Sequence, residues 1–358
     1  MTEHILNPLD GAEGRPLRGP HNAEAMQNAA DPTVSLEERL EAYEDIFESE
    51  VGDTALTRGR HLERETGLRQ LYLKFEGSNP SGTQKDRIAF AQVMDALRRG
   101  FDTVTVATCG NYGAAVAEAA RVAGIRAVVL VPAQYQTRRI QEIESDGAII
   151  RRVAGDYEQA VSASQELADA QGLYDANPGG ANTPIQLAAY GQIAYEIYDE
   201  LRDAPAIVTL PVSNGTTLAG VHKGFVSLYR RGKTSRIPRM VGSSTFGKNP
   251  IVRSFRLNLL HCEPLSPEKI RETSINEPLV NWNSLDGDLA LEAIRSSHGW
   301  AAYTSDKAML QMARKLAEQE SLNVLPAATA GLISLLDQHD RSAFVGDRYV
   351  AILTGRKS

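Results

Sequence analysis

Lys85, within the segment KFEGSNPSGTQKDRIAF (residues 74–90), has the surroundings expected of a lysine that does chemistry. It follows a run of Gly, Asn, Pro and Ser, which favour turns, and it stands at the start of an expected helix. A lysine amine held in such a place can form a Schiff base with a carbonyl compound. The alternative is a solvated surface lysine at a helix start, and the other loops of the chain must decide between the two.

Two more polar loops have the same setting, since each follows an expected strand and precedes an expected helix. They are TCGNYGAA (residues 108–115) and PVSNGTTLAG (residues 211–220). In open parallel α/β sheets, ligands bind outside the carboxyl ends of the strands, where such loops gather. Three loops of this kind predict one shared ligand site.

The third loop has the composition of a phosphate site. Ser213, Asn214, Gly215, Thr216 and Thr217 offer peptide N–H groups and hydroxyls just before a helix, whose N-terminus favours anions. The loop lacks the Gly-Lys-Ser/Thr ending of a nucleotide P-loop, which weakens the alternative of a nucleotide-binding enzyme. A plain strand–helix turn is the other alternative. A Schiff-base lysine together with a phosphate cradle indicates pyridoxal phosphate chemistry.

Short apolar runs alternate with helical stretches along the part of the chain that must position these loops. Strands are expected at 71–76, 103–108, 127–132, 148–153 and 206–212, and helices at 87–100, 113–124, 137–147, 156–172 and 183–201. Apolar strands that alternate with helices predict an α/β fold with parallel sheets covered on both faces. Near the N-terminus, SLEERLEAYEDIF predicts a helix with Ser35 as N-cap and Glu38 completing a capping box.

Composition limits the class of protein. The chain has 358 residues, enough for two domains, and a formal net charge of -7, which argues against a nucleic-acid partner. It contains no apolar run of the roughly 20 residues that span a membrane, and no secretory signal is evident. Its two cysteines, Cys109 and Cys262, predict neither a disulfide framework nor a metal site, and they fit a cytoplasmic protein. Residues 1–34 are expected to form an irregular N-terminal arm.

The three loops resemble those of the fold-type II pyridoxal-phosphate enzymes, the tryptophan synthase β-like family. EGSNPSGTQKDR is similar to the lysine motif of this family, CGNYGAA to its asparagine loop and PVSNGTTLAG to its phosphate loop. The nearest likeness within the family is to threonine synthase. Four further segments resemble that enzyme: PVSNGTTLAGVHKGF, KNPIVRSF, INEPLVNW and PAATAGLISL. The likeness extends from about residue 36 to residue 358.

The resemblance implies two open parallel-sheet, three-layer domains. Residues 35–87 and 201–358 would form a large cofactor-binding domain, and residues 88–200 a small mobile one. The resemblance also implies pyridoxal 5'-phosphate as cofactor, a small amino-acid substrate and a homodimer.

Roles for individual residues follow from the same resemblance. Lys85 would carry the cofactor as a Schiff base and move the substrate's α-proton, and Asn111 would bond the cofactor's ring oxygen. Ser213–Thr217 would hold the phosphate, and the Thr354 hydroxyl would face the pyridine nitrogen. Asn111 as a helix N-cap and Thr354 as an ordinary strand-end residue are the alternatives. The residues expected to contact substrate are Ser81, Thr83, Cys109, Tyr112 and Gly113.

Other side chains leave several interpretations open. Cys109 is more simply a small buried cysteine than a nucleophile. Asp86 and Arg87 are expected to orient the helix of Lys85. Lys248 and Arg253 would meet an acidic or phosphorylated group of the substrate or form surface ion pairs.

The chain departs from the family where substrate would bind. Thr83 and Gln84 replace a common Ser-Phe pair before the lysine, and Tyr112 takes the place of the Thr that commonly follows the asparagine. Hydroxyls that would grip a phosphorylated side chain are therefore fewer, so the substrate is expected to differ.

The expected reaction is elimination or replacement on an amino acid with a leaving group on its β- or γ-carbon. The reference reaction is that of threonine synthase, O-phosphohomoserine plus water to threonine plus phosphate, with an altered substrate as the hypothesis. β-Replacement on an O-activated serine and dehydration of serine or threonine are alternatives. A catalytically silent binding homologue is the alternative from outside the enzymes.

Overall fold

The computed structural model describes residues 21–108, 110–135 and 139–357. The described residues form two compact units. Unit 1 contains the residues up to Gly52 together with Asn79–Gln186, and unit 2 contains Asp53–Ser78 and Leu187–Lys357. The chain passes from unit 1 to unit 2 within the long helix α8 (Thr183–Leu201).

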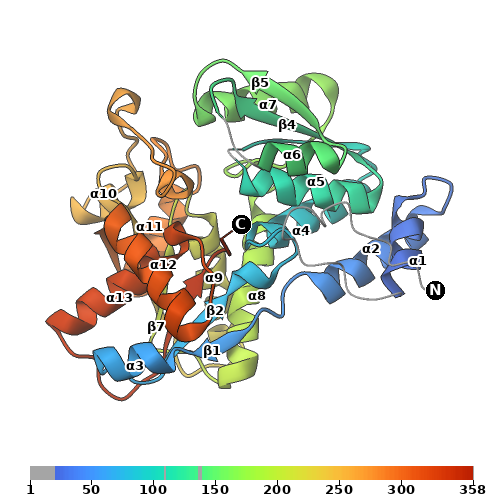
Figure 1. Ribbon diagram of the computed structural model, residues 1–358. Helices are drawn as coiled ribbons and strands as arrows, with labels where there is room; N and C mark the ends of the chain where they lie inside the picture. Colours follow the sequence, from blue (N-terminus) through green and yellow to red (C-terminus); the bar gives the residue numbers. More distant parts are fainter. Residues whose placement is uncertain (1–20, 109, 136–138, 358) are drawn as a thin grey trace. The chain divides into compact units, whose positions relative to one another are not determined.

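Unit 1 is built around a parallel sheet with the strand order β5-β4-β3-β6. Helix α7 packs on one face, and Figure 1 shows α5 and α6 on the other side of β4. The central strands are buried, as parallel strands covered on both faces must be, whereas the edge strand β5 carries the exposed Arg151 and Arg152. Its strands are β3 (Thr103–Ala107), β4 (Arg126–Pro132), β5 (Ile149–Val153) and β6 (Tyr174–Asp175), and its helices are α1 (His21–Ala30), α2 (Leu36–Glu50), α4 (Lys85–Arg98), α5 (Asn111–Ala123), α6 (Arg139–Ser145) and α7 (Tyr157–Gln171).

Unit 2 contains the larger sheet, with the order β1-β2-β10-β7-β8-β9. Its strands are parallel except β1, which pairs antiparallel with β2 at the edge. The strands are β1 (Leu56–Arg58), β2 (Leu71–Phe75), β7 (Ile207–Pro211), β8 (Arg239–Thr245), β9 (Trp300–Thr304) and β10 (Tyr349–Leu353). The helices are α3 (Arg60–Thr66), α9 (Thr216–Arg230), α10 (Pro250–Arg256), α11 (Gly287–Ser296), α12 (Asp306–Glu320) and α13 (Ala330–Arg341), with short 3-10 turns η1 (Glu76–Ser78), η2 (Pro267–Lys269), η3 (Glu277–Leu279) and η4 (Pro326–Thr329).

Helices cover both faces of the larger sheet. Val241 of β8 belongs to the apolar cluster that includes Leu335 of α13. The next residue, Gly242, points to the opposite face, where a Cβ atom would lie 3.1 Å from Leu218 of α9 and 3.2 Å from Ile294 of α11. Each unit is therefore a three-layer α/β unit, which confirms the expected fold class.

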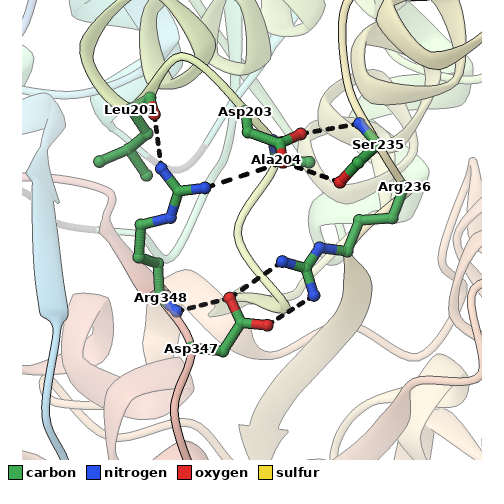
Figure 2. A network of polar contacts seen from close by, with 7 residues as sticks. All are labelled: Leu201, Asp203, Ala204, Ser235, Arg236, Asp347 and Arg348. Carbon is green, nitrogen blue, oxygen red and sulfur yellow. Dashed lines mark hydrogen bonds and ion pairs between the residues drawn. The ribbon is translucent and has the colours of Figure 1, made fainter.

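A network of ion pairs lies at the amino ends of three neighbouring strands of unit 2 (Figure 2). The Arg236 guanidinium, before β8, binds both carboxylate oxygens of Asp347, before β10, at 2.5 and 3.0 Å. Asp203, before β7, accepts hydrogen bonds from the peptide N–H and the hydroxyl of Ser235, both at 2.7 Å. These bonds fix the ends of the strands that lie away from the polar loops.

The unit boundaries differ from those expected from the sequence. Residues 36–52 and 79–87 pack with unit 1, because α2 lies against α4: the Tyr43 hydroxyl donates to the Phe90 carbonyl at 3.2 Å, and their rings stack. Residues 187–200 pack with unit 2. Close approach of α8 to α9 explains this, since a Cβ at Gly224 would lie 2.5 Å from the Gly191 carbonyl oxygen.

The N-terminal arm is not irregular throughout. Residues 21–30 form α1, and residues 1–20 lie outside the described residues. The Arg39 side chain donates to the Ala29 carbonyl at 3.1 Å and to the Ala123 carbonyl at 2.8 Å, which ties α1 to α5. The predicted Ser35–Glu38 capping box of α2 is confirmed. No helix within the described residues has the length and hydrophobicity that a membrane span requires.

Candidate functional site

The lysine loop lies in unit 1 and is held by its own polar groups. Lys85 is the first residue of α4 and is partly buried. Its peptide N–H donates to the Thr83 hydroxyl at 3.2 Å, and the Ser81 N–H donates to the Asp86 carboxylate at 3.0 Å. Asp86 is fully buried, so it holds the loop at Ser81 from the inside. The Ser81 hydroxyl is also buried and has no hydrogen-bond partner among the described residues.

The asparagine loop, also in unit 1, is organised by Thr108. The hydroxyl of Thr108 accepts from the N–H of Gly110 at 3.1 Å and of Gly113 at 3.2 Å. A Cβ atom at Gly113 would lie 2.5 Å from Thr108 Cγ2, so this position requires glycine. Cys109, expected to contact substrate, lies outside the described residues.

Asn111 is not the N-cap of its helix. Helix α5 begins at Asn111, and its N-cap, Gly110, has no side chain to cap it. The Asn111 Oδ1 atom instead accepts a hydrogen bond from Arg139 Nε at 3.1 Å. The Asn111 side chain is therefore directed by a residue of α6 that sequence reasoning missed.

The ring of Tyr112 lies beside Lys85, and its hydroxyl is bonded within the interior of unit 1. The Lys85 amine lies 5.4 Å from the centroid of the Tyr112 ring, a cation–π distance. The phenol hydroxyl donates to the Ala176 carbonyl at 2.7 Å and accepts from Gln92 Nε2. Gln186 Nε2 in turn donates to Gln92 Oε1 at 3.0 Å. The ring is thus the part of Tyr112 beside Lys85, while the hydroxyl is occupied.

Gln92 and Gln186 were missed as contributors to this network. Both are fully buried. Glutamine is seldom fully buried without hydrogen-bond partners. Gln92 is the single polar residue in the apolar run IAFAQVM, and this pattern could have indicated its buried role.

The predicted phosphate loop lies in unit 2, between β7 and α9. Gly215, the N-cap of α9, has a φ of +96°, and a Cβ atom there would lie 2.8 Å from both the Asp286 carbonyl oxygen and Ala290 Cβ. The first turn of α9 has no side-chain cap. Its peptide N–H groups therefore suit an anion such as a phosphate.

A second polar segment, residues 281–286, braces the phosphate loop. Asn281 Nδ2 donates to Asn214 Oδ1 at 3.0 Å, and the Thr216 hydroxyl donates to the Asp286 carboxylate at 2.5 Å. The Ser284 hydroxyl donates to the Ser213 carbonyl at 3.0 Å. The side chains of Asn214 and Thr216 are thereby directed to the brace. Sequence reasoning assigned no role to these bracing residues, because they lie about 70 positions from the loop.

Thr354 lies at the same sheet edge as the phosphate loop. It directly follows β10, which pairs in parallel with β7 through Tyr349 and Ile207, and Ala351 and Thr209. The carboxyl ends of neighbouring parallel strands meet at one edge, so Thr354 and the phosphate loop both extend from that edge of the unit 2 sheet. Arg253, by contrast, forms an exposed ion pair with Glu263 at 3.8 Å.

Charged groups are buried behind the lysine loop in unit 1. The side chain of Glu118, on α5, is 1% exposed, and its carboxyl oxygens have no hydrogen-bond partner among the described residues. Burial, with the nearby charges of Asp86 and Asp146, holds the pKa of Glu118 well above its usual range. The Glu118 carboxyl therefore resists ionisation, which limits its repulsion with the carboxylates of Asp86 and Asp146.

A family model described as pyridoxal-phosphate dependent enzyme matches residues 47–355, most of the chain. This chain belongs to that family. Its cofactor is pyridoxal 5'-phosphate, and it is an enzyme.

Curated relatives include threonine synthases of two organisms. The threonine synthase of Methanosarcina acetivorans is 31% identical over 305 residues, 85% of this chain and 74% of the relative. That of Methanocaldococcus jannaschii is 32% identical over 311 residues, with the same coverage. The resemblance noted in the sequence is confirmed.

Solved structures share the fold at lower identity. A T.th. threonine deaminase matches with a TM-score of 0.73 and 19% identity, over 89% of this chain and 97% of that one. Maize serine racemase matches with a TM-score of 0.71 and 18% identity, over 89% and 94%. These identities support the fold alone.

Proposed function

We propose that this enzyme is threonine-synthase-like and acts on an amino acid with a leaving group on its β- or γ-carbon. The threonine synthases at 31% and 32% identity support the reaction class. O-phosphohomoserine plus water to threonine plus phosphate is the reference reaction. The substrate itself, we propose, is altered.

The residues present fit the cofactor. Gly215 leaves room where a side chain would collide with Asp286, and the uncapped first turn of α9 suits a phosphate. We propose that the peptide groups of Ser213–Thr217 bind the phosphate, because Asn214 and Thr216 use their side chains elsewhere. Thr354 would face the pyridine nitrogen; a neutral hydroxyl there does not favour a protonated ring as a carboxylate would.

Lys85 is the proposed catalytic residue. Bound pyridoxal phosphate withdraws electrons from the substrate's α-carbon and makes its proton removable. The Lys85 amine would hold the cofactor at rest and move that proton during turnover. The Tyr112 ring, 5.4 Å from the amine, would limit where the freed amine can go. Ser81, Thr83 and Gly113 stay proposed substrate contacts, and so does Cys109.

The contacts of Tyr112 are the observation that supports the proposal of an altered substrate. Its ring lies beside Lys85, and its hydroxyl is bonded to Ala176 and Gln92, so neither can grip a phosphorylated side chain. Residues 113–115 are Gly-Ala-Ala and add no hydroxyl. A pocket without these donors discriminates against O-phosphohomoserine, because phosphate oxygens that lose water and gain no hydrogen-bond partner lower the affinity.

A product assay tests the proposal. Loaded enzyme is given O-phosphohomoserine, O-phosphoserine and O-acetylserine separately, and products are followed by mass spectrometry with Lys85→Ala as control. We expect threonine formation to be slower than turnover of another substrate. Threonine formed at an ordinary enzymatic rate, and lost in Lys85→Ala, would contradict the altered substrate while supporting the reaction class.

A substitution at Tyr112 tests the cause. Tyr112→Thr places a hydroxyl beside Lys85, so relative turnover of O-phosphohomoserine should rise about tenfold, the equivalent of one hydrogen bond. Tyr112→Phe keeps the ring and should keep the substrate preference, although it leaves the Ala176 carbonyl and Gln92 without the phenol. Equal preference in all three proteins would exclude Tyr112 as the determinant.

Three further expectations stay predictions. The three polar loops are expected to serve one ligand. A homodimer and a cytoplasmic location are expected from the family likeness and from the cysteine content. Light scattering of the purified protein tests the dimer.

A further inference from the structure

Arg139 connects the two polar loops of unit 1 that the cofactor chemistry needs. Its Nε atom donates to Asn111 Oδ1 at 3.1 Å, and its Nη2 atom donates to the Ser81 carbonyl at 2.7 Å. Its Nη1 atom forms an ion pair with Glu142 of the same helix, α6. One guanidinium thus spans the asparagine loop and the lysine loop.

The position of Arg139 is well defined. Its side chain is 11% exposed and that of Glu142 is 16% exposed, so the ion pair is largely shielded from solvent. Three of its nitrogen atoms have partners on three different segments, and a planar guanidinium can satisfy these only in a narrow range of orientations. The side chain is therefore a rigid support.

The contact to Asn111 fixes which end of the amide is which. An asparagine amide has an oxygen that accepts and a nitrogen that donates. Because Arg139 donates to Oδ1, the Nδ2 end is turned away from the guanidinium as the donor end. The proposed role of Asn111, to bond the anionic ring oxygen of pyridoxal phosphate, requires a donor.

We propose that Arg139 is a positioning residue that orients Asn111 as a hydrogen-bond donor to the ring oxygen of the cofactor. It does so by holding Oδ1, and its positive charge strengthens the donor through the polarised amide. The contact to Ser81 keeps the lysine loop in register with Asn111. This inference rests on the proposed role of Asn111.

Other charges around Arg139 belong to the same unit. Glu142 of α6 is its ion-pair partner, and Glu118 of α5 interacts electrostatically with both Arg139 and Asp86 of α4. Burial raises the pKa of Glu118 well above its usual range, whereas the positive charge of Arg139 acts to lower it.

The expected consequence is spectroscopic. A hydrogen-bond donor and a positive charge near the anionic ring oxygen favour loss of a proton from the bound cofactor. They therefore lower the pH at which its visible absorption changes. Arg139→Gln removes the charge and the fixed donor to Oδ1. The titration midpoint of the loaded protein should then rise by about one pH unit, the equivalent of one charge-assisted hydrogen bond.

A double-mutant cycle isolates the route through Asn111. Absorption titrations are recorded for wild type, Arg139→Gln, Asn111→Ala and the double variant, all loaded with pyridoxal phosphate. We expect most of the Arg139→Gln shift to vanish in the Asn111→Ala background. An equal shift in both backgrounds would overturn the proposal, because Arg139 would then act on the cofactor without Asn111.

Two controls separate positioning from general damage. Glu142→Gln removes only the ion-pair partner and should shift the midpoint much less than Arg139→Gln. Arg139→Lys keeps the positive charge but loses the planar guanidinium, so its titration midpoint should lie between those of wild type and Arg139→Gln. It also replaces Arg139→Gln in the experiment if that variant does not fold. A midpoint unchanged in every Arg139 variant would overturn the inference alone, whereas a wild type without a Lys85-dependent visible band would overturn the proposed function.

Discussion

The residues proposed to carry the chemistry have neighbours that limit what each of them can do. Lys85 has an aromatic ring beside its amine, Asn111 has a guanidinium at its oxygen, and Thr216 has its hydroxyl turned to a carboxylate. Each of these contacts narrows the role that residue type alone would allow. The assignment of function is therefore sharpest where the partner of a side chain is known.

Glu118 gives a prediction at this scale. Its pKa in the folded protein is raised above the usual value of 4.5, chiefly by burial and then by Asp86 and Asp146. The stability that its neutral form contributes is present below about pH 4.5 and is lost as the pH rises toward the folded-state pKa. Glu118→Gln cannot ionise, so the variant should gain stability relative to wild type steadily as the pH rises.

Urea unfolding between pH 4.5 and 8 measures the difference. The exposed Glu144→Gln on α6 is the control for loss of a carboxylate elsewhere in unit 1. A difference between Glu118→Gln and wild type that stays constant across this range would show that the buried carboxyl does not resist ionisation.

Helix α1 gives the prediction at the scale of elements. Gly124 ends α5 with a φ of +63°, and a Cβ atom there would lie 2.1 Å from the Ala30 carbonyl oxygen. Gly172 ends α7 with a φ of +64° and nothing within 4 Å. Both Gly→Ala changes carry the left-handed strain of about 1–2 kcal/mol, but only Gly124→Ala must also displace α1, which should cost about 1–3 kcal/mol more.

Urea midpoints and amide exchange of residues 21–30 check this prediction. Gly124→Ala should speed exchange in α1, whereas Gly172→Ala should leave it unchanged. Equal losses of stability and equal exchange in the two variants would mean that α1 does not dock on the end of α5.

The sequence predicted strands β2–β5 and β7 and helices α2 and α4–α8 because strong local signals specify them. Buried apolar strands, the Ser35–Glu38 capping box and the glycines that end helices all act within a few residues. Strands β1, β6, β8 and β9 were not predicted. Of these, β1 and β6 have only 3 and 2 residues and are defined by pairing. Helix α1 was missed because its docking depends on close contact between Ala30 and Gly124, which lies far along the chain.

The candidate site divides in the same way. The loops that carry Lys85, Asn111 and the proposed phosphate cradle could be predicted from residue types and from their place between strand and helix. Their supports could not, since Arg139 lies 58 positions from Ser81 and Asp286 lies 70 positions from Thr216. Contacts over such separations are set by tertiary packing, which no short motif encodes.

At the scale of the whole molecule, we expect the two ends of the unit 2 sheet to have different roles. Ion pairs at the amino ends of the strands stabilise the fold, and the loops at the carboxyl ends are proposed to bind the cofactor. The ion pairs of Figure 2 lie at the amino ends of the strands, while the phosphate loop and Thr354 follow the carboxyl ends. Asp347→Asn should lower the free energy of unfolding by about 1 kcal/mol, because the pair with Arg236 is bidentate but partly exposed. It should leave the affinity for pyridoxal phosphate unchanged.

Asp286→Asn is the matched comparison at the other end of the sheet. This carboxylate is buried and holds Thr216 of the phosphate loop, so its loss should weaken cofactor binding about tenfold as one charge-assisted hydrogen bond is lost. Fluorescence titration of each protein with pyridoxal phosphate measures both affinities. Loss of affinity in Asp347→Asn to the same extent would contradict the separation.

Locating the cofactor on the chain tests the role of Lys85 most directly. The loaded protein is reduced with borohydride, digested, and analysed by mass spectrometry for a pyridoxyl-phosphate-modified lysine. We expect modification of Lys85 in the peptide that contains NPSGTQKDR, and no modified lysine in Lys85→Ala. Modification of another lysine, or none in a protein that still turns over substrate, would contradict it.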